Sequence, residues 1–237
     1  MSSSVVEARV KAVEEAVKLV ERKRPRVLGL GSGTTMRLFI DKLAEYLPDF
    51  EREVLCVPTS HDIAVKARRQ GFVVLDPVSS PDPDLTIDSA DEVDSELNLL
   101  KGGGGALTLE KIVAKRSKQY IVVVDDRKVV DKLCAAHPIP VEVLPPAWQY
   151  VANKLERILP ISAIALREGT GKLGPLTTDL GNFILDVKPS EPLEPDEVAV
   201  IEKRIKELTG VVEVGLFPGR IVSKVVLGYA GGVKVLG

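Results

Sequence analysis

The sequence predicts an α/β protein in which a mostly parallel sheet with helices on its faces is followed by a smaller α+β domain. Two observations predict this. Up to about residue 130, short apolar strands alternate with helical patterns, and glycine-rich or acidic loops follow several of the strands. Beyond Val130, prolines interrupt the chain, and two helices and several strands are packed into a short stretch.

In the first part, valine recurs from Val6 to Val20 at close to helical spacing, with lysine and glutamate between, which predicts a helix over 5–20. The same reasoning predicts helices over 36–46, 60–70 and 106–115, and strands over 26–30, 53–57, 72–75, 85–87 and 120–124. In the second part we expect helices over 147–158 and 195–208 and strands over 162–167, 183–187 and 211–216.

Composition gives no general attraction to nucleic acid or membranes; a local basic patch is the alternative. The net charge over 237 residues is −2, and no uncharged apolar run approaches the roughly 18 residues of a membrane helix. Because residues 1–4 lead straight into a charged helical pattern, we expect no signal peptide. Cys56 and Cys134 are too few for a disulfide scaffold and lack metal-ligand spacing, so we expect buried thiols in a reducing cytoplasm.

The most informative stretch is the run of four glycines, Gly102–Gly105, between Lys101 and a helical pattern that contains Glu110. Ordering glycines costs backbone entropy, so a folded protein keeps four of them for a reason. Without Cβ atoms a ligand can approach the main-chain N–H groups, and a helix N-terminus adds its dipole. We interpret the run as an anion site flanked by a cation and a candidate base; a flexible linker is the alternative.

A second loop, over 29–35, joins a predicted strand to a predicted helix, at the edge where parallel sheets bind ligands. Ser32, Thr34 and Thr35 place hydroxyl groups beside glycine N–H groups. The G-x-G-x-x-G spacing of dinucleotide sites is not met, so the loop suits a single phosphate. A plain strand-to-helix turn is the alternative.

A third loop is acidic and follows the strand at 85–87. Asp88 and Asp91 come first, with Glu92 and Asp94 behind them. Carboxylates without a metal are suited to holding sugar hydroxyls and moving protons; a solvated surface run and a divalent-metal loop are the alternatives. Lys128 follows the strand at 120–124, where an isolated lysine is ordinarily a surface residue.

These motifs together resemble one family. The stretches GLGSGTT (29–35), PTS (58–60), DSADE (88–92) and KGGGGAL (101–107) occur in the order and at the intervals of ribose-5-phosphate isomerase of type A. TDLGNF (178–183) and GVVE (210–213) extend the resemblance over nearly the whole chain. Ser89 stands where this family usually has glycine and Leu180 where asparagine is common, and neither change removes a side chain that would do chemistry.

The resemblance implies a Rossmann-like domain over 1–130 and 209–237 and a smaller ferredoxin-like domain over 131–208 that serves as lid or in oligomerisation. It implies a cytoplasmic homodimer or homotetramer of the pentose phosphate pathway that interconverts D-ribose 5-phosphate and D-ribulose 5-phosphate without metal or organic cofactor. Glu110 would accept the proton. The residues that would contact the sugar phosphate are Ser32, Gly33, Thr34, Thr35, Asp88, Ser89, Ala90, Asp91, Lys101, Gly102, Gly103, Gly104 and Lys128.

The chemistry of that reaction suits these residue types. A proton moves from C2 to C1 through an enediolate, which needs a base that reaches both carbons and donors at the developing oxyanion. A carboxylate on a helix, Glu110, suits the base, and Lys101 with the glycine N–H groups suits the oxyanion. Asp88 is the preferred acid/base for ring opening, with Asp91 holding the open chain.

Two functions from other classes stay open. A sugar-phosphate-sensing binding protein would need a DNA-binding module, for which 1–24 is too short and insufficiently basic. The other is a different enzyme on a related fold, such as an amino-sugar phosphate deaminase or a coenzyme A transferase. A deaminase is expected to rely on a histidine, and neither His61 nor His137 lies in a site-like motif.

Overall fold

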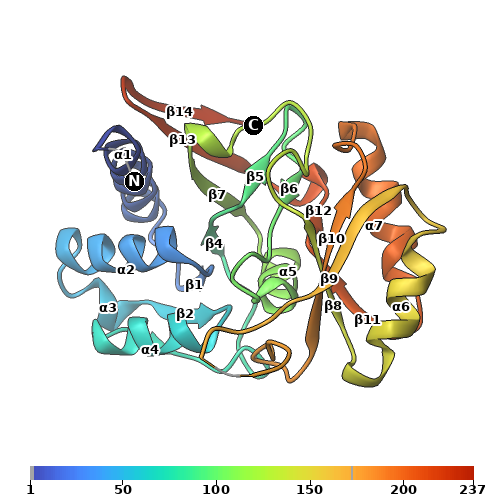
Figure 1. Ribbon diagram of the computed structural model, residues 1–237. Coiled ribbons are helices and arrows are strands. Elements are labelled where there is room, and N and C mark those ends of the chain that lie inside the picture. The colour runs from blue at the N-terminus through green and yellow to red at the C-terminus, as the bar shows by residue number, and fades with distance from the viewer. Residues whose placement is uncertain (1–2, 172) are drawn as a thin grey trace. The chain divides into compact units, whose positions relative to one another are not determined.

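The computed structural model describes residues 3–171 and 173–237 (Figure 1). Residues 1 and 2, with which the signal-peptide expectation begins, lie outside the described residues. The chain forms two compact units. The first unit contains the chain up to Ala90, Leu109–Val129 and Ile221–Gly237, and the second contains Asp91–Thr108 and Val130–Arg220. The predicted division into folding domains, 1–130 with 209–237 and 131–208, stays a prediction.

The first unit is built on a seven-stranded sheet in the order β14-β13-β7-β4-β1-β2-β3. Neighbouring strands are parallel except β13 and β14, which are antiparallel. The strands are β1 (Val27–Leu30), β2 (Leu55–Pro58), β3 (Val73–Val74), β4 (Leu85–Asp88), β7 (Tyr120–Asp125), β13 (Lys224–Tyr229) and β14 (Gly232–Leu236). Because β1 lies between β2 and β4, the strand order reverses there, and parallel sheets bind ligands at such a point.

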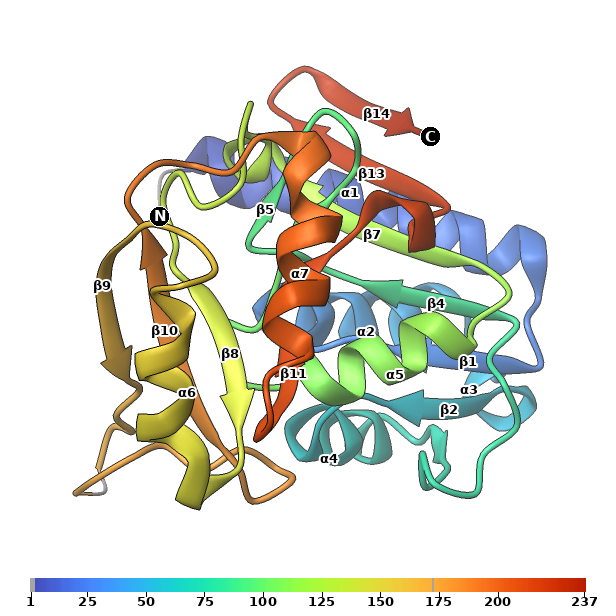
Figure 2. The same cartoon turned by 90° about the vertical axis from the view of Figure 1, so that its right-hand side faces the viewer.

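Helices cover both faces of this sheet. Successive side chains of a strand point to opposite faces, and in strands such as β1 and β7 both sets are mostly apolar and need to be buried. Leu28 and Ile87 pack in a core with side chains of α1 (Ser3–Lys23), α2 (Thr34–Tyr46) and α4 (His61–Arg69). Val27 packs on the opposite face against Val113 of α5 (Leu107–Arg116). Figure 2 shows α5 in front of these strands and α1 behind them. A short helix, α3 (Phe50–Glu53), precedes β2.

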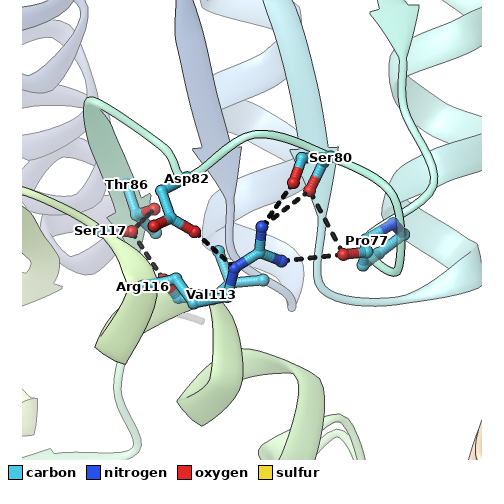
Figure 3. A network of polar contacts seen from close by, with 7 residues as sticks. All are labelled: Pro77, Ser80, Asp82, Thr86, Val113, Arg116 and Ser117. Carbon is cyan, nitrogen blue, oxygen red and sulfur yellow. Dashed lines mark hydrogen bonds and ion pairs between the residues drawn. The ribbon is translucent and has the colours of Figure 1, made fainter.

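The C-terminal end of α5 is tied to the loop between β3 and β4 (Figure 3). Arg116 donates to the Asp82 carboxylate at 2.8 Å, to the Pro77 carbonyl at 2.8 Å and to the Ser80 carbonyl at 2.6 Å. One arginine therefore satisfies three acceptors of a loop that has no regular structure, and it fixes the helix that carries Glu110.

The second unit contains a four-stranded antiparallel sheet in the order β11-β8-β10-β9. The chain runs β8 (Ile139–Val143), α6 (Trp148–Leu155), β9 (Ile161–Leu166), β10 (Phe183–Pro189), α7 (Val198–Lys206) and β11 (Val211–Val214), which is the βαββαβ pattern of ferredoxin-like folds. Both helices pack on one face in a common apolar core. A three-stranded sheet, β12-β6-β5, joins Leu216–Phe217, Leu99–Leu100 and Glu92–Val93.

The predicted fold class is confirmed: a mostly parallel sheet with helices, accompanied by separate antiparallel sheets. The predicted strand over 211–216 is divided at Gly215, whose N–H donates to the Pro140 carbonyl and whose carbonyl accepts from Lys101 N–H. The strand β8 was not predicted, because Pro140 argues against an interior strand. Both cysteines are free and buried, as expected. Within residues 3–171 and 173–237, no helix is long and apolar enough to cross a membrane.

Candidate active site

The loops that follow β1, β2 and β4 are tied together at the point where the strand order reverses. Ser89 Oγ donates to the Ser32 carbonyl at 3.2 Å, and Ser32 Oγ lies 2.7 Å from Thr59 Oγ1. Gly31 is required for this approach, because a Cβ there would lie 1.9 Å from Asp88 Oδ1. The sequence departure at Ser89 therefore adds a link between the two predicted ligand loops.

The glycine–threonine loop ends in the N-terminus of α2. Gly33 has φ 96°, in the left-handed region that favours glycine, and Thr34 and Thr35 are the first two residues of the helix. Their N–H groups belong to the first turn, where the helix itself supplies no acceptor. This geometry suits a phosphate, as the sequence predicted.

A cation that sequence reasoning missed lies beside this loop. Arg9 Nη1 is 3.5 Å from Thr34 Oγ1, and Arg9 Nη2 is 3.5 Å from Asp125 Oδ2. The Arg9 side chain is 14% exposed. The sequence around Arg9 does not predict these contacts, because they depend on how α1 packs near the end of β7.

The buried acids Asp88 and Glu110 both act on one tyrosine, Tyr120. Asp88 is fully buried, with Oδ1 accepting from Ser89 N–H at 2.7 Å and Oδ2 accepting from the Tyr120 hydroxyl at 2.9 Å. Burial raises the pKa of Tyr120 well above its usual value, and the negative charges of Asp88 and Glu110 raise it further. Tyr120 therefore stays a neutral donor. The sequence predicted Asp88 and Glu110, and identified Tyr120 only as the start of a strand.

In the second unit, the glycine run forms an ordered turn. Gly105 N–H donates to the Gly102 carbonyl at 3.0 Å, and both residues have positive φ, 79° and 101°. Gly103 and Gly104 are exposed at the tip. Asp91 Oδ2 accepts from Gly103 N–H at 2.9 Å, so the structure brings this acid and the glycine run together.

Lys101 is held just before this turn. The residue is only 3% exposed, and its N–H donates to the Gly215 carbonyl at 2.8 Å. Its Nζ lies 5.6 Å from the centroid of the Phe217 ring, a distance at which the ring face attracts a cation. Lys101 is therefore held in place by its surroundings and is not a mobile surface group.

The other two acids of the third loop serve the backbone. Both Glu92 carboxylate oxygens accept from consecutive amides, from Cys134 to His137, at 2.6–3.3 Å. Asp94 accepts from the N–H groups of Glu96 and Asn98. Across the part of the chain that the structure describes, no cluster of His, Cys, Asp and Glu could hold a metal ion.

The remaining polar candidates lie at turns. Lys128 ends a single 3₁₀ turn, Asp126–Lys128, directly after β7, and is half-buried. Since β7, β4 and β1 are parallel, this turn lies at the same sheet edge as the loops that follow β1 and β4. His61 is the exposed first residue of α4, and His137 Nδ1 lies 3.1 Å from Glu92.

The predicted site residues thus form two groups. The first unit holds Ser32, Gly33, Thr34, Thr35, Asp88, Ser89, Ala90, Glu110 and Lys128, and the second holds Asp91, Lys101, Gly102, Gly103 and Gly104. The first group combines a phosphate-type helix terminus with two buried carboxylates, and the second combines a buried cation with exposed amides. Buried carboxylates suit proton transfer, and a buried cation with exposed amides suits a developing oxyanion.

Comparison with known proteins gives one consistent result. The family model described as ribose 5-phosphate isomerase A (phosphoriboisomerase A) matches residues 55–232. The ribose-5-phosphate isomerase A of Archaeoglobus fulgidus is 41% identical over 225 residues, covering 95% of this chain and 96% of the relative. The Pyrococcus horikoshii protein of the same name is 40% identical over 238 residues, covering 98% and 99%.

Solved structures agree. The ribose 5-phosphate isomerase A of Methanocaldococcus jannaschii superposes with a TM-score of 0.88 at 38% identity, covering 98% of this chain and 99% of that chain. A D-ribose-5-phosphate isomerase in complex with phospho-erythronic acid superposes with a TM-score of 0.89 at 38% identity, covering 100% and 99%. By sequence and by fold, this chain belongs to the ribose 5-phosphate isomerase A family.

Proposed function

We propose that this protein is a ribose-5-phosphate isomerase that interconverts D-ribose 5-phosphate and D-ribulose 5-phosphate through an enediolate. The observation that carries the proposal is a pair of buried carboxylates in a chain of this family: Asp88 accepts from the Tyr120 hydroxyl, and the charge of Glu110 also acts on Tyr120. Two carboxylates in different environments can divide ring opening and proton transfer between them.

Each residue takes a role that its surroundings support. Glu110, on a helix fixed at its far end by Arg116, moves the proton between C2 and C1. Asp88, oriented by Tyr120, exchanges a proton with the ring oxygen or hydroxyl during ring opening. Asp91 holds the open chain. Lys101 supplies positive charge to the enediolate oxygen, where fixed charges lower the barrier most.

The phosphate is assigned to the N-terminus of α2. The N–H groups of Thr34 and Thr35 and the hydroxyl of Ser32 supply donors there. Arg9, 3.5 Å from Thr34, and Lys128 supply positive charge. A phosphate held away from C1 lets its binding energy be used for orientation of the reacting carbons. The complex of a similar isomerase with phospho-erythronic acid supports a phosphorylated ligand.

We further propose that the protein works in the cytoplasm, in the pentose phosphate pathway, as a homodimer or homotetramer and without metal or organic cofactor. The sensing and deaminase alternatives are not favoured, because the relatives that match over nearly the whole chain are isomerases.

The test is a substrate panel in metal-free buffer after dialysis against a strong chelator. Ribulose 5-phosphate should form from ribose 5-phosphate, free ribose should react poorly, and an amino-sugar phosphate should release no ammonia. Ammonia release without isomerisation would favour the deaminase. Activity that disappeared on chelation and returned only with a divalent metal would contradict the metal-free mechanism.

A further inference from the structure

We propose that Arg167, a residue outside the predicted site, positions the glycine run: paired with Asp186, it fixes the turn so that Gly104 N–H is presented as a donor to the substrate. The proposal rests on the isomerase function proposed above. It gives the ferredoxin-like sheet a part in the chemistry, because Arg167 follows β9 and Asp186 lies in β10.

Arg167 donates four hydrogen bonds to other residues of the protein. Its Nε and Nη2 donate to the two oxygens of Asp186 at 2.8 and 2.5 Å. Its Nη1 donates to the carbonyls of Gly102 at 2.8 Å and Gly103 at 3.1 Å. A guanidinium has five N–H groups, so four of them are used and little capacity is left for a substrate anion. Arg167 is therefore a positioning residue.

The two carbonyl contacts dictate where the amides of the turn point. In a trans peptide the C=O and the following N–H point in opposite directions, and the chain has no cis peptide bonds among its described residues. With the Gly102 carbonyl on Arg167, Gly103 N–H points the other way and reaches Asp91 at 2.9 Å. With the Gly103 carbonyl on Arg167, Gly104 N–H also points away from the guanidinium.

Gly104 N–H is the donor that this arrangement leaves for a ligand. Gly105 N–H returns to the Gly102 carbonyl and Gly103 N–H is taken by Asp91, whereas the described residues offer Gly104 N–H no acceptor. A Cβ on Gly104 would meet nothing within 4 Å, so the space beside it is open. An exposed, oriented amide is suited to a developing oxyanion.

A glycine turn needs such a restraint. The central peptide of a four-residue turn can rotate between two turn types, which reverses its C=O and N–H, and glycine removes the steric penalty. Here the central peptide joins Gly103 to Gly104, and the Arg167 contact with the Gly103 carbonyl selects one orientation. Charge-assisted bonds from a planar fork hold both carbonyls and Asp186 at once, which a lysine cannot do.

The glycine turn packs against the four-stranded antiparallel sheet of the second unit. Pro140 of β8 and Asp186 of β10 are register partners, and helices α6 and α7 pack among the alternate residues of these strands. Cβ atoms on Gly102 and Gly105 would lie 3.2 Å from Pro140 and 3.5 Å from Ile184, so the turn lies directly on these side chains.

The test compares Arg167→Lys with Arg157→Lys, a matched change at an exposed arginine of the same unit. Loss of one oxyanion donor typically lowers kcat by about 10²–10³-fold. Arg167→Lys should therefore lose at least 10²-fold in kcat with a much smaller change in KM, while Arg157→Lys stays within about twofold. Asp186→Asn should lower kcat by a smaller factor, because this change weakens the hold on the Arg167 guanidinium without removing the guanidinium.

Two further measurements separate positioning from simple damage to the fold. Millimolar guanidinium, but not sodium chloride, should restore part of the kcat of Arg167→Ala. Amide hydrogen exchange of the segment 101–106 should accelerate in Arg167→Lys and not in Arg157→Lys. This measurement does not depend on catalytic activity. A wild-type kcat in Arg167→Lys, or unchanged exchange of this segment, would overturn the inference. Inactivity of the unmodified protein towards ribose 5-phosphate would instead refute the proposed function, and the exchange measurement would still decide the role of Arg167.

Discussion

Replacing Tyr120 by phenylalanine tests the arrangement around the buried acid Asp88. The change removes one hydroxyl and keeps a ring that is 1% exposed. The hydroxyl donates at 2.9 Å to a carboxylate that is fully buried, so water cannot replace it without rearrangement. Hydrogen bonds to charged groups contribute about 1.5–3 kcal/mol, and we expect the free energy of unfolding to fall by that amount.

The assay is urea unfolding, in which a shift of the midpoint at constant slope reports a change in stability. Tyr46→Phe is the matched control, because its hydroxyl donates to Glu14 at 3.3 Å from a side chain that is 52% exposed. The control should stay within about 0.5 kcal/mol of the unmodified protein. Equal stability of the two variants would refute the reasoning about Asp88.

The same tyrosine predicts an alkaline pH dependence with a definite sign. Burial, then the charges of Asp88 and Glu110, raise the folded pKa of Tyr120 well above the unfolded value of 10.0. Above that pH the unfolded chain loses the phenolic proton while the folded protein keeps it, so stability falls as pH rises. Tyr120→Phe lacks this contribution, and the stability difference between it and the unmodified protein should shrink above about pH 10. A difference that grew with pH would contradict the assignment.

Three shorter predictions follow. Gly31→Ala places a Cβ 1.9 Å from Asp88 Oδ1 and should lower the free energy of unfolding by at least about 1–3 kcal/mol in the same urea assay. Thr34→Val should reduce the preference for ribose 5-phosphate over free ribose; an unchanged ratio of kcat/KM values would place the phosphate elsewhere. Ellman's reagent should label neither cysteine in the folded protein, because burial raises the pKa of Cys56 to about 12 and burial, then Glu92, raises that of Cys134. Rapid labelling under native conditions would contradict that burial.

The sequence predicted five of the seven strands of the first sheet, all but β13 and β14, because the physical signals there are local. Each strand of a covered parallel sheet is a short apolar run, and each ends in a loop of glycine, hydroxyl or acid. The loops that contain Ser32 and Ser89 lie together, as expected from the rule that parallel strands present their carboxyl ends at one edge of the sheet. The left-handed backbone at Gly33 and Gly102 explains why those glycines cannot be replaced without strain.

The residues that sequence reasoning missed act through contacts distant in the chain. Tyr120 reaches Asp88 across two neighbouring strands, and Arg167 reaches Gly102 across more than sixty positions. Arg9 meets Thr34 only because α1 packs beside the end of β7. Periodicity shows which residues lie on the same face of a helix or strand, but it does not show which distant loop that face contacts. The strand β8 was missed for the opposite reason. Proline is locally disfavoured in an interior strand, but the pairing of β8 with β10 and β11 overrides that preference at Pro140.

The central claim is that Glu110 moves the proton, and one measurement tests it most directly. Glu110→Gln keeps the shape of a side chain that is 5% exposed and removes its basic oxygen. Exchange of the C2 proton of ribose 5-phosphate with deuterated solvent should be followed beside turnover, with substrate binding measured separately. We expect binding to persist while exchange and isomerisation both fall by at least about 10²–10⁴-fold. A variant that binds ribose 5-phosphate and still exchanges at the original rate would show that Glu110 is not the base, and Asp88 would take its place.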